Sequence, residues 1–450
     1  MRIPYVITMP LLLAVTVPAI ADPALIPEEL PPFISTPPEP VYTGPLAETG
    51  KWLHDKGIDI RLDYLNIYQN APAYGYRSGS YGVVILDTIG HLTPDLRVRF
   101  AEAFNLQIFN VGGYVNAFIP AAFDKSKTDL ARFTLEADFL DDRLRVEVGR
   151  MGLGRDFMVG GFCGGISCYN ATMGASLNLP GDSLAVWGMQ TAYKLTPDTS
   201  LGFAIIEDNP GNWQSGEGWD WSQGDAEGFI TVADIHHEET FLNSAHPLKY
   251  EVGFYYRDTP YTDALYNSGW GNPTFGANTR IVTHEGNPAF YSHLRKVVWS
   301  NPTDAMIPEN LAVVGGLYHT FGEGQAYPWE AYAGVEYSGF LPQNPLTTIG
   351  AAVHYIRLSE ERAQYERNAR LFYSGIDEEQ PQNMFMFDFH TSTEVFHNGV
   401  FNVGAAYVIN PNTSILADFS TGRRKDGFIF YASLGFDLSG ALGLSPRRTP

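Results

Sequence analysis

The most regular feature of the chain is an alternation of apolar and polar residues with a period of two. Residues 58–64 (IDIRLDY) show it most strictly, and similar runs recur up to residue 438. The clearest of the other runs are residues 96–108, 132–139, 143–148 and 428–437. Because successive side chains of a β-strand point to opposite faces, this pattern predicts strands with one apolar and one polar face. Turns rich in Gly, Pro, Asn and Asp separate the runs, so the sequence predicts an all-β fold.

A few segments depart from this period. Residues 46–56 predict a short helix that ends at Gly57. Residues 358–371 show the best helical periodicity, although the same stretch could also form a loop. Glu102 interrupts the apolar face of residues 96–108, which indicates a bulge, a strand end or a change of register.

The alternation by itself does not say which face of each strand meets water. In a soluble β-sandwich the apolar faces pack inward, whereas in a transmembrane barrel they contact lipid and the polar faces line the lumen. Three features favour the barrel: polar faces that carry Arg and Glu together, aromatic residues at the ends of apolar faces, and long polar connections that contrast with tight ones. At about 25 residues for a strand and its connection, residues 57–438 predict an antiparallel barrel of about 16 strands.

The ends of the chain follow different patterns. A basic residue, an apolar stretch and an A-x-A sequence make residues 1–21 a predicted secretory signal. Residues 22–45 are rich in proline and do not alternate, so we expect an extended leader. Residues 46–438 are then the barrel domain with its first short helix, and residues 439–450 form a C-terminal tail.

The composition narrows the possible functions. The chain has 29 Lys and Arg against 50 Asp and Glu, a formal net charge of −21, which argues against binding to nucleic acid. Charged residues make up 18%, below the roughly 25% of ordinary soluble proteins. No segment beyond the signal is apolar for long enough to predict a helix that spans a membrane.

The sequence predicts neither a cofactor nor a metal site. The run of residues 236–239 (HHEE) lacks a ligand geometry, because adjacent residues of a strand point in opposite directions. Cys163 and Cys168 are the two cysteines and have no neighbouring His, so they suit a disulfide across a small loop better than a zinc site.

Several segments, in this order and spacing, resemble the OprB-type carbohydrate-selective porins. The resemblance runs from about residue 46 to residue 438. Its segments are residues 49–53 (TGKWL), 56–58 (KGI), 142–150 (DRLRVEVGR), 207–211 (EDNPG), 337–342 (YSGFLP) and 407–411 (YVINP). The resemblance implies a monomeric barrel of 16 strands in the outer membrane of a Gram-negative bacterium. Such a protein is not an enzyme: it passes monosaccharides and related polyols by facilitated diffusion through an arginine-bearing constriction.

A sugar pore needs hydrogen-bond donors that replace water around hydroxyl groups, and binding weak enough to allow exit. The candidate constriction residues are Arg61, Arg97, Arg99, Arg132, Arg145 and Arg150, with Glu136 and Glu147 as their orienting partners. All of these arginines except Arg150 lie on the polar faces of their predicted strands. The alternative is that they are ordinary solvated lumen residues in cross-strand pairs.

A tryptophan-rich segment offers a second candidate site. Trp213, Trp219 and Trp221 lie in one long connection and could form an aromatic platform at the mouth of the pore. They could equally be the small core of a connection that folds on itself. Two other functions stay open at this point: a porin for small organic acids or general solutes, and a secreted all-β carbohydrate-active enzyme or lectin.

Overall fold

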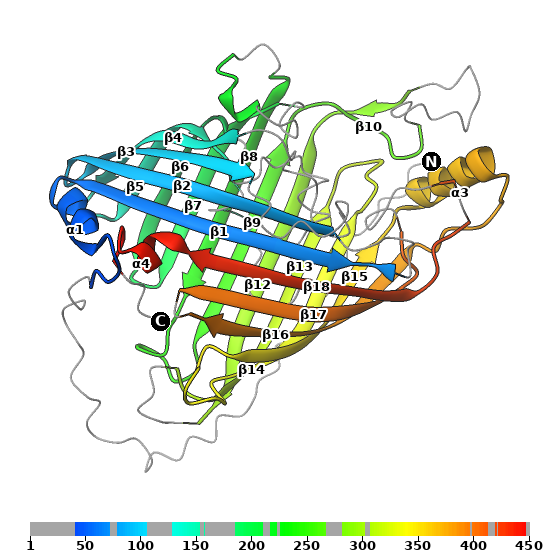
Figure 1. Ribbon diagram of the computed structural model, residues 1–450. Helices are drawn as coiled ribbons and strands as arrows, with labels where there is room; N and C mark the ends of the chain where they lie inside the picture. Colours follow the sequence, from blue (N-terminus) through cyan, green and yellow to red (C-terminus); the bar gives the residue numbers. More distant parts are fainter. Residues whose placement is uncertain are drawn as a thin grey trace, which may run out of the picture. The chain divides into compact units, whose positions relative to one another are not determined.

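Sixteen antiparallel strands form a closed barrel in the computed structural model (Figure 1). The structure describes residues 41–72, 79–105, 128–153, 157, 185–209, 217–222, 226–266, 281–301, 307–396, 398–412, 419–420 and 422–446. Strands that neighbour each other in the chain also pair in the barrel, and β1 (Ile58–Asn70) pairs with β18 (Gly427–Asp437) to close it. The predicted fold class is therefore confirmed.

The barrel strands between these two are 8 to 15 residues long. They are β2 (Gly79–Thr93), β3 (Leu96–Asn105), β4 (Thr128–Phe139), β5 (Leu144–Met151), β6 (Val186–Thr196), β7 (Thr199–Asp208), β8 (Gly228–Glu238), β9 (Leu248–Arg257), β12 (Asn287–Ser300), β13 (Asn310–Thr320), β14 (Trp329–Ser338), β15 (Thr348–Arg357), β16 (Asn383–Val395) and β17 (Gly399–Ile409). A separate two-stranded sheet joins β10 (Tyr261–Thr262) to β11 (Thr283–His284).

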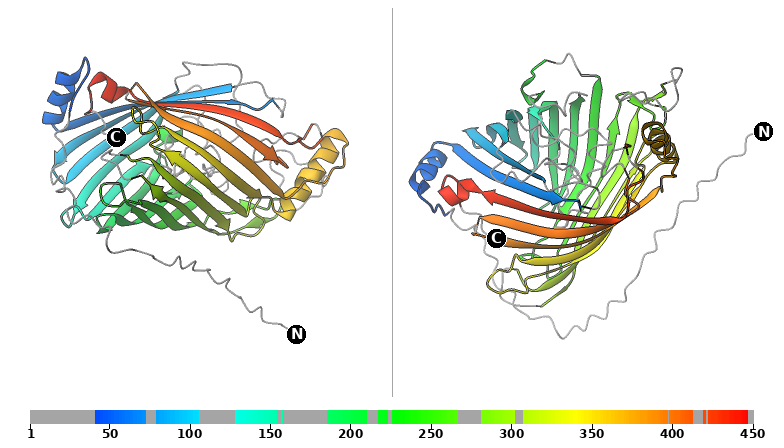
Figure 2. Two further views of the ribbon diagram at one scale, coloured as in Figure 1. Left: turned by 90° about the horizontal axis from the view of Figure 1, so that it is seen from below. Right: turned by 45° about the vertical axis from the view of Figure 1, so that its right-hand side comes forward.

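The connections differ between the two ends of the barrel. At one end they are short, as in residues 140–143 between β4 and β5. At the other end they are long, as in residues 152–185 between β5 and β6. Helices α1 (Ala47–Asp55) and α4 (Leu438–Leu442) lie side by side at the end with short connections, whereas α3 (Glu360–Ser374) lies at the opposite end (Figure 2). None of the described helices is long and apolar enough to cross a membrane.

Strand β16 shows how the alternation of the sequence maps onto the barrel. Phe385, Phe387 and Phe389 are exposed on the outer face, while Met386 and Asp388 between them are buried on the inner face. Because strand pairing places register partners on the same face, the inner face can be followed from strand to strand around the barrel. The outer face is apolar, and the polar residues point into the lumen.

Two departures from the alternation have clear structural causes. The register of β3 against β4 shifts between Ala101 and Glu102, because Ala131 is an extra residue of β4 at this point. The bulge therefore lies in β4, opposite Glu102. The segment that could be helix or loop is helix α3, which begins after Ser359 because that side chain accepts a hydrogen bond from the Arg362 backbone N–H. Gly375, with φ at 73°, ends the helix in the left-handed region.

Candidate functional site

A chain of ion pairs crosses the lumen face of β2, β3, β4 and β5. Arg99 of β3 donates to both carboxylate oxygens of Asp87, at 2.9 and 2.6 Å, and to Glu136 of β4 at 3.4 Å. Arg97 donates to Glu136 at 3.2 Å and to Asp138 at 2.7 Å. These contacts follow from the strand register, in which Arg97 lies directly opposite Glu136.

The chain continues onto β5 through a shared carboxylate. Asp138 accepts a second hydrogen bond from Arg145 at 2.9 Å, and the two residues are register partners. Asp138 thus holds Arg97 and Arg145 side by side. The Arg145 side chain is 54% exposed, whereas that of Arg97 is 12% exposed. Arg145 is therefore the most accessible guanidinium of this ion-pair chain.

A second pair lies next to this chain. Arg132 of β4 donates from one nitrogen to both carboxylate oxygens of Glu147, each at 3.0 Å, and from another to the Gly152 carbonyl at 3.3 Å. Gln190 of β6 also donates to Glu147. The Arg132 and Glu147 side chains are only 5% and 3% exposed, so they form a buried ion pair in the wall.

The structure brings together four of the eight predicted constriction residues, Arg97, Arg99, Glu136 and Arg145, in the ion-pair chain with Asp87 and Asp138. The Arg132–Glu147 pair lies alongside. Arg61 is exposed on β1 and is the register partner of Asp87. Arg150 lies apart from the lumen group, because it is the register partner of outward-facing Phe133 and of Trp187. Its guanidinium contacts the Trp187 ring and donates to the Ala185 carbonyl at 2.6 Å.

The described part of the tryptophan-rich connection packs against the outer wall. The Trp219 ring lies 6.2 Å from Phe100, and Trp221 lies 5.7 Å from Phe133, both on the outer face. Trp219 belongs to a single 3-10 turn, η5 (Glu217–Trp219), that packs on β4. The prediction of an aromatic platform at the pore mouth is therefore wrong for Trp219 and Trp221, since their partners are outward-facing rings. Trp213 lies outside the described residues, as do Cys163 and Cys168.

Two important carboxylates were absent from the predicted site. Asp138 lies on the polar face of the alternating run 132–139, so the sequence contained the signal for it. The lumen position of Asp87 was harder to predict, because this residue follows the apolar run of residues 83–86 (VVIL) in β2. Its position became clear only from the pairing of β2 with β3, which places it within reach of Arg99.

Two described residues of the connection between β5 and β6, Leu153 and Phe157, lie against the inner wall. These residues belong to a buried apolar cluster with inward-facing side chains that include Ile206, Val232 and Tyr255. Because these partners come from β7, β8 and β9, the described part of this connection lies against the inner wall. The sequence alone did not indicate which connection folds inward.

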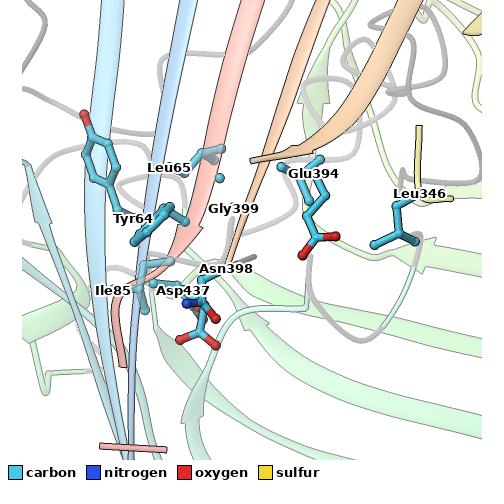
Figure 3. Close-up of a pocket in the computed structure, with 12 residues that line it drawn as sticks. Tyr64, Leu65, Ile85, Leu346, Glu394, Asn398, Gly399 and Asp437 are labelled. Carbon is cyan, nitrogen blue, oxygen red and sulfur yellow. The ribbon is translucent and has the colours of Figure 1, made fainter. Parts of the chain in front are cut away.

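A separate pocket of about 390 Å³ lies between β1, β17 and β18 near the end with short connections (Figure 3). Its lining combines the carboxylates of Asp63, Glu394 and Asp437 with apolar side chains such as Leu65 and Ile85. The lining contains no arginine, so its chemistry differs from that of the ion-pair chain on β2–β5.

The family model for the carbohydrate-selective porins of the OprB family matches residues 96–385. The chain belongs to this family. That membership, together with the barrel, indicates a channel of the Gram-negative outer membrane rather than an enzyme, as the sequence predicted. The short connections of such barrels face the periplasm and the long ones face the outside of the cell.

Known relatives support the same assignment. The chain is 23% identical over 258 residues to Porin B of Pseudomonas aeruginosa, a match that covers 55% of this chain and 55% of that protein. The matched part thus spans about half the length of the curated relative. The structure of Pseudomonas putida OprB at high pH superimposes with a TM-score of 0.71 at 16% identity, covering 88% of this chain and 98% of that one. The low-pH structure of the same protein has a TM-score of 0.52 at 14% identity. These two similarities confirm the fold.

Proposed function

We propose that this OprB porin passes monosaccharides and related small polyols by facilitated diffusion, through a constriction formed by the arginines of β3, β4 and β5. The observation that carries this proposal is the pairing of the arginines with carboxylates. Asp138 in particular neutralises part of the charge of both Arg97 and Arg145 while their guanidinium planes stay in the lumen wall. A paired guanidinium keeps donors for a hydroxyl group but attracts anions less than an unpaired one.

This arrangement suits neutral solutes better than small organic acids. An arginine constriction with few carboxylates would concentrate anions. Here Asp87, Glu136, Asp138 and Glu147 each lie within 3.5 Å of an arginine nitrogen. Sugar hydroxyls can donate to such carboxylates and accept from the guanidinium groups, so a passing sugar can exchange its water shell for wall contacts.

Single-channel recording in a planar bilayer with glucose titrated into the bath tests the proposal. We expect glucose to reduce the current in wild-type channels, and Arg97→Ala or Arg145→Ala to weaken this block or to raise the conductance. Arg143→Ala is the matched control, because exposed Arg143 lies in the periplasmic turn and bonds to Tyr193. A channel that glucose does not block would remove sugar from the proposal, and anion-dominated current would favour organic acids.

We further propose that the outward apolar band contacts lipid directly. Phe389 is 65% exposed at the middle of β16, whereas Phe428 is 50% exposed at the extracellular end of β18. Phe389→Arg should therefore lower the free energy of unfolding in lipid bilayers by about 2–4 kcal/mol, and Phe428→Arg by only about 0–1 kcal/mol. Urea titration of the folded barrel in liposomes measures both values. Equal losses at the two depths would contradict a lipid-facing band.

The remaining assignments concern maturation and assembly. We propose that residues 1–21 are removed on export, that residues 22–45 form a periplasmic leader, and that residues 46–438 act as a monomeric pore. Location in the outer membrane supports the first of these, because the chain must be exported to reach it. The Cys163–Cys168 disulfide stays a prediction.

A further inference from the structure

Ring side chains on the lumen face of β12, β14, β16 and β18 lie along the wall, over the neighbouring strand. Tyr332 of β14 has Gly316 of β13 as its register partner, and Gly316 in turn pairs with His293 of β12. The Tyr332 hydroxyl oxygen lies 3.1 Å from His293 Nδ1, so the side chain passes over Gly316. A Cβ atom on Gly316 would lie closer than 3.0 Å to the Tyr332 ring. The ring can therefore occupy this position only above a glycine.

Three other sets of neighbouring strands repeat the arrangement. In each, a ring side chain has a glycine as its register partner and reaches a polar group on the strand beyond. The sets are Tyr291 over Gly253 to Asp234 at 3.2 Å, His390 over Gly350 to Glu336 at 3.5 Å, and Tyr431 over Gly404 to Asp388 at 2.9 Å. A Cβ atom on any of these glycines would also lie closer than 3.0 Å to its ring.

These four ring side chains, Tyr291, Tyr332, His390 and Tyr431, are here called the belt. Two of its members are linked through Asp388, which contacts His390 Nδ1 at 2.9 Å and accepts a hydrogen bond from the Tyr431 hydroxyl group. The belt spans the inner wall from β8 to β18. Its side chains are buried, at 0–6% exposure.

The repetition indicates a role beyond local packing. Glycine inside a strand costs roughly 0.5–1 kcal/mol relative to alanine, and here it recurs at the one position where the partner ring needs space. A large side chain of lumen parity normally stands away from the sheet toward the pore axis. When it lies over a glycine, the ring stays close to the barrel wall and does not project into the lumen.

We propose that the belt sets the bore of the pore along β8–β18, opposite the arginine-bearing strands. The proposal rests on the proposed function only in that the barrel conducts solutes, and it does not depend on which solute passes. Each belt residue acts as a positioning residue, because its glycine keeps the ring against the wall and its polar partner holds it there.

Conductance of Gly350→Ala and Gly404→Ala in potassium chloride tests the proposal. The added methyl group lifts His390 or Tyr431 toward the pore axis, so we expect a fall in single-channel conductance that exceeds the spread of wild-type channels. Gly435→Ala is the matched control, since Gly435 also has lumen parity on β18 and a Cβ there would meet no atom within 4 Å. Its conductance should equal that of the wild type.

A rescue variant distinguishes narrowing of the pore by the displaced ring from a general disturbance of the barrel. Gly404→Ala combined with Tyr431→Ser removes the displaced ring, and should restore at least the wild-type conductance. Heat-modifiable mobility on gels checks that each barrel is folded. If Gly404→Ala alone does not fold, the comparison of Gly350→Ala with Gly435→Ala decides. Wild-type conductance in a folded single variant, or no gain in the double variant over folded Gly404→Ala, would overturn the proposal. Absence of glucose block would count against sugar transport and leave this comparison unchanged.

Discussion

Replacing Arg132 by Met should lower the free energy of unfolding of the barrel by about 3–5 kcal/mol, because it leaves the Glu147 carboxylate buried without its guanidinium partner. The two side chains are 5% and 3% exposed, and Arg132 holds both carboxylate oxygens of Glu147. Gln190 would retain its hydrogen bond to Glu147 but supplies no charge. Urea unfolding of the folded barrel in bilayers, followed by tryptophan fluorescence, measures the loss.

Arg145→Met provides the matched control for this experiment. It removes an arginine from the same face of the next strand, but the Arg145 side chain is 54% exposed and Asp138 keeps its contact with Arg97. We expect a loss of about 0–1 kcal/mol, the usual value for an exposed ion pair. Equal losses for the two variants would mean that the burial of the Arg132–Glu147 pair does not govern its contribution.

Replacing Asp87 and Asp138 together by Asn should make the pore favour anions. The double substitution removes two negative charges from the ion-pair chain while Arg97, Arg99 and Arg145 stay in place. A unit charge about 8 Å from a passing ion contributes roughly 2 kcal/mol at an effective dielectric constant of about 20, before screening by salt. Salt in the pore screens most of this energy, so we expect the chloride-to-potassium permeability ratio to rise by roughly tenfold, which corresponds to about 1.4 kcal/mol. The reversal potential in a potassium chloride gradient measures it.

The control for this change removes the same charge elsewhere. Asp377 and Glu379 both contact Arg367 at the extracellular end, outside the strands. Asp377→Asn with Glu379→Gln should shift the permeability ratio far less, because both groups are solvated and distant from the ion-pair chain. An equal shift in both double variants would show that overall charge, rather than the wall of β2–β5, sets selectivity.

The fold could be read from the sequence because its main signal is local. Alternation in β16 or β18 depends only on the direction of successive side chains, and it survives whatever the strand pairs with. The bulge itself lies in β4 at Ala131, whereas the sequence pattern marked only Glu102 on the neighbouring strand. The prediction for helix α3 stayed ambiguous, because its long polar connection has both helical and loop features. The N-terminal cap at Ser359 became evident only from the backbone structure.

Only part of the candidate site could be predicted from the sequence. Side-chain parity placed Arg97, Arg99, Glu136 and Arg145 on one face, but it could not say which arginine meets which carboxylate. That depends on the register between strands, which the turns and the bulge of β4 at Ala131 decide together. The predicted aromatic platform was wrong for Trp219 and Trp221 for a related reason. The position of a long connection relative to the strands does not follow from any local period of the sequence.

The sequence by itself thus determined the strands, their approximate number and the shared face of Arg97, Arg99, Glu136 and Arg145, since these follow from a period of two along single strands. Tertiary structure decided the rest. It joined Asp87 to Arg99, put Arg150 beneath Trp187 on the outer wall, and brought Leu153 against the inner wall. Contacts across strands depend on register and closure, and no single segment contains that information.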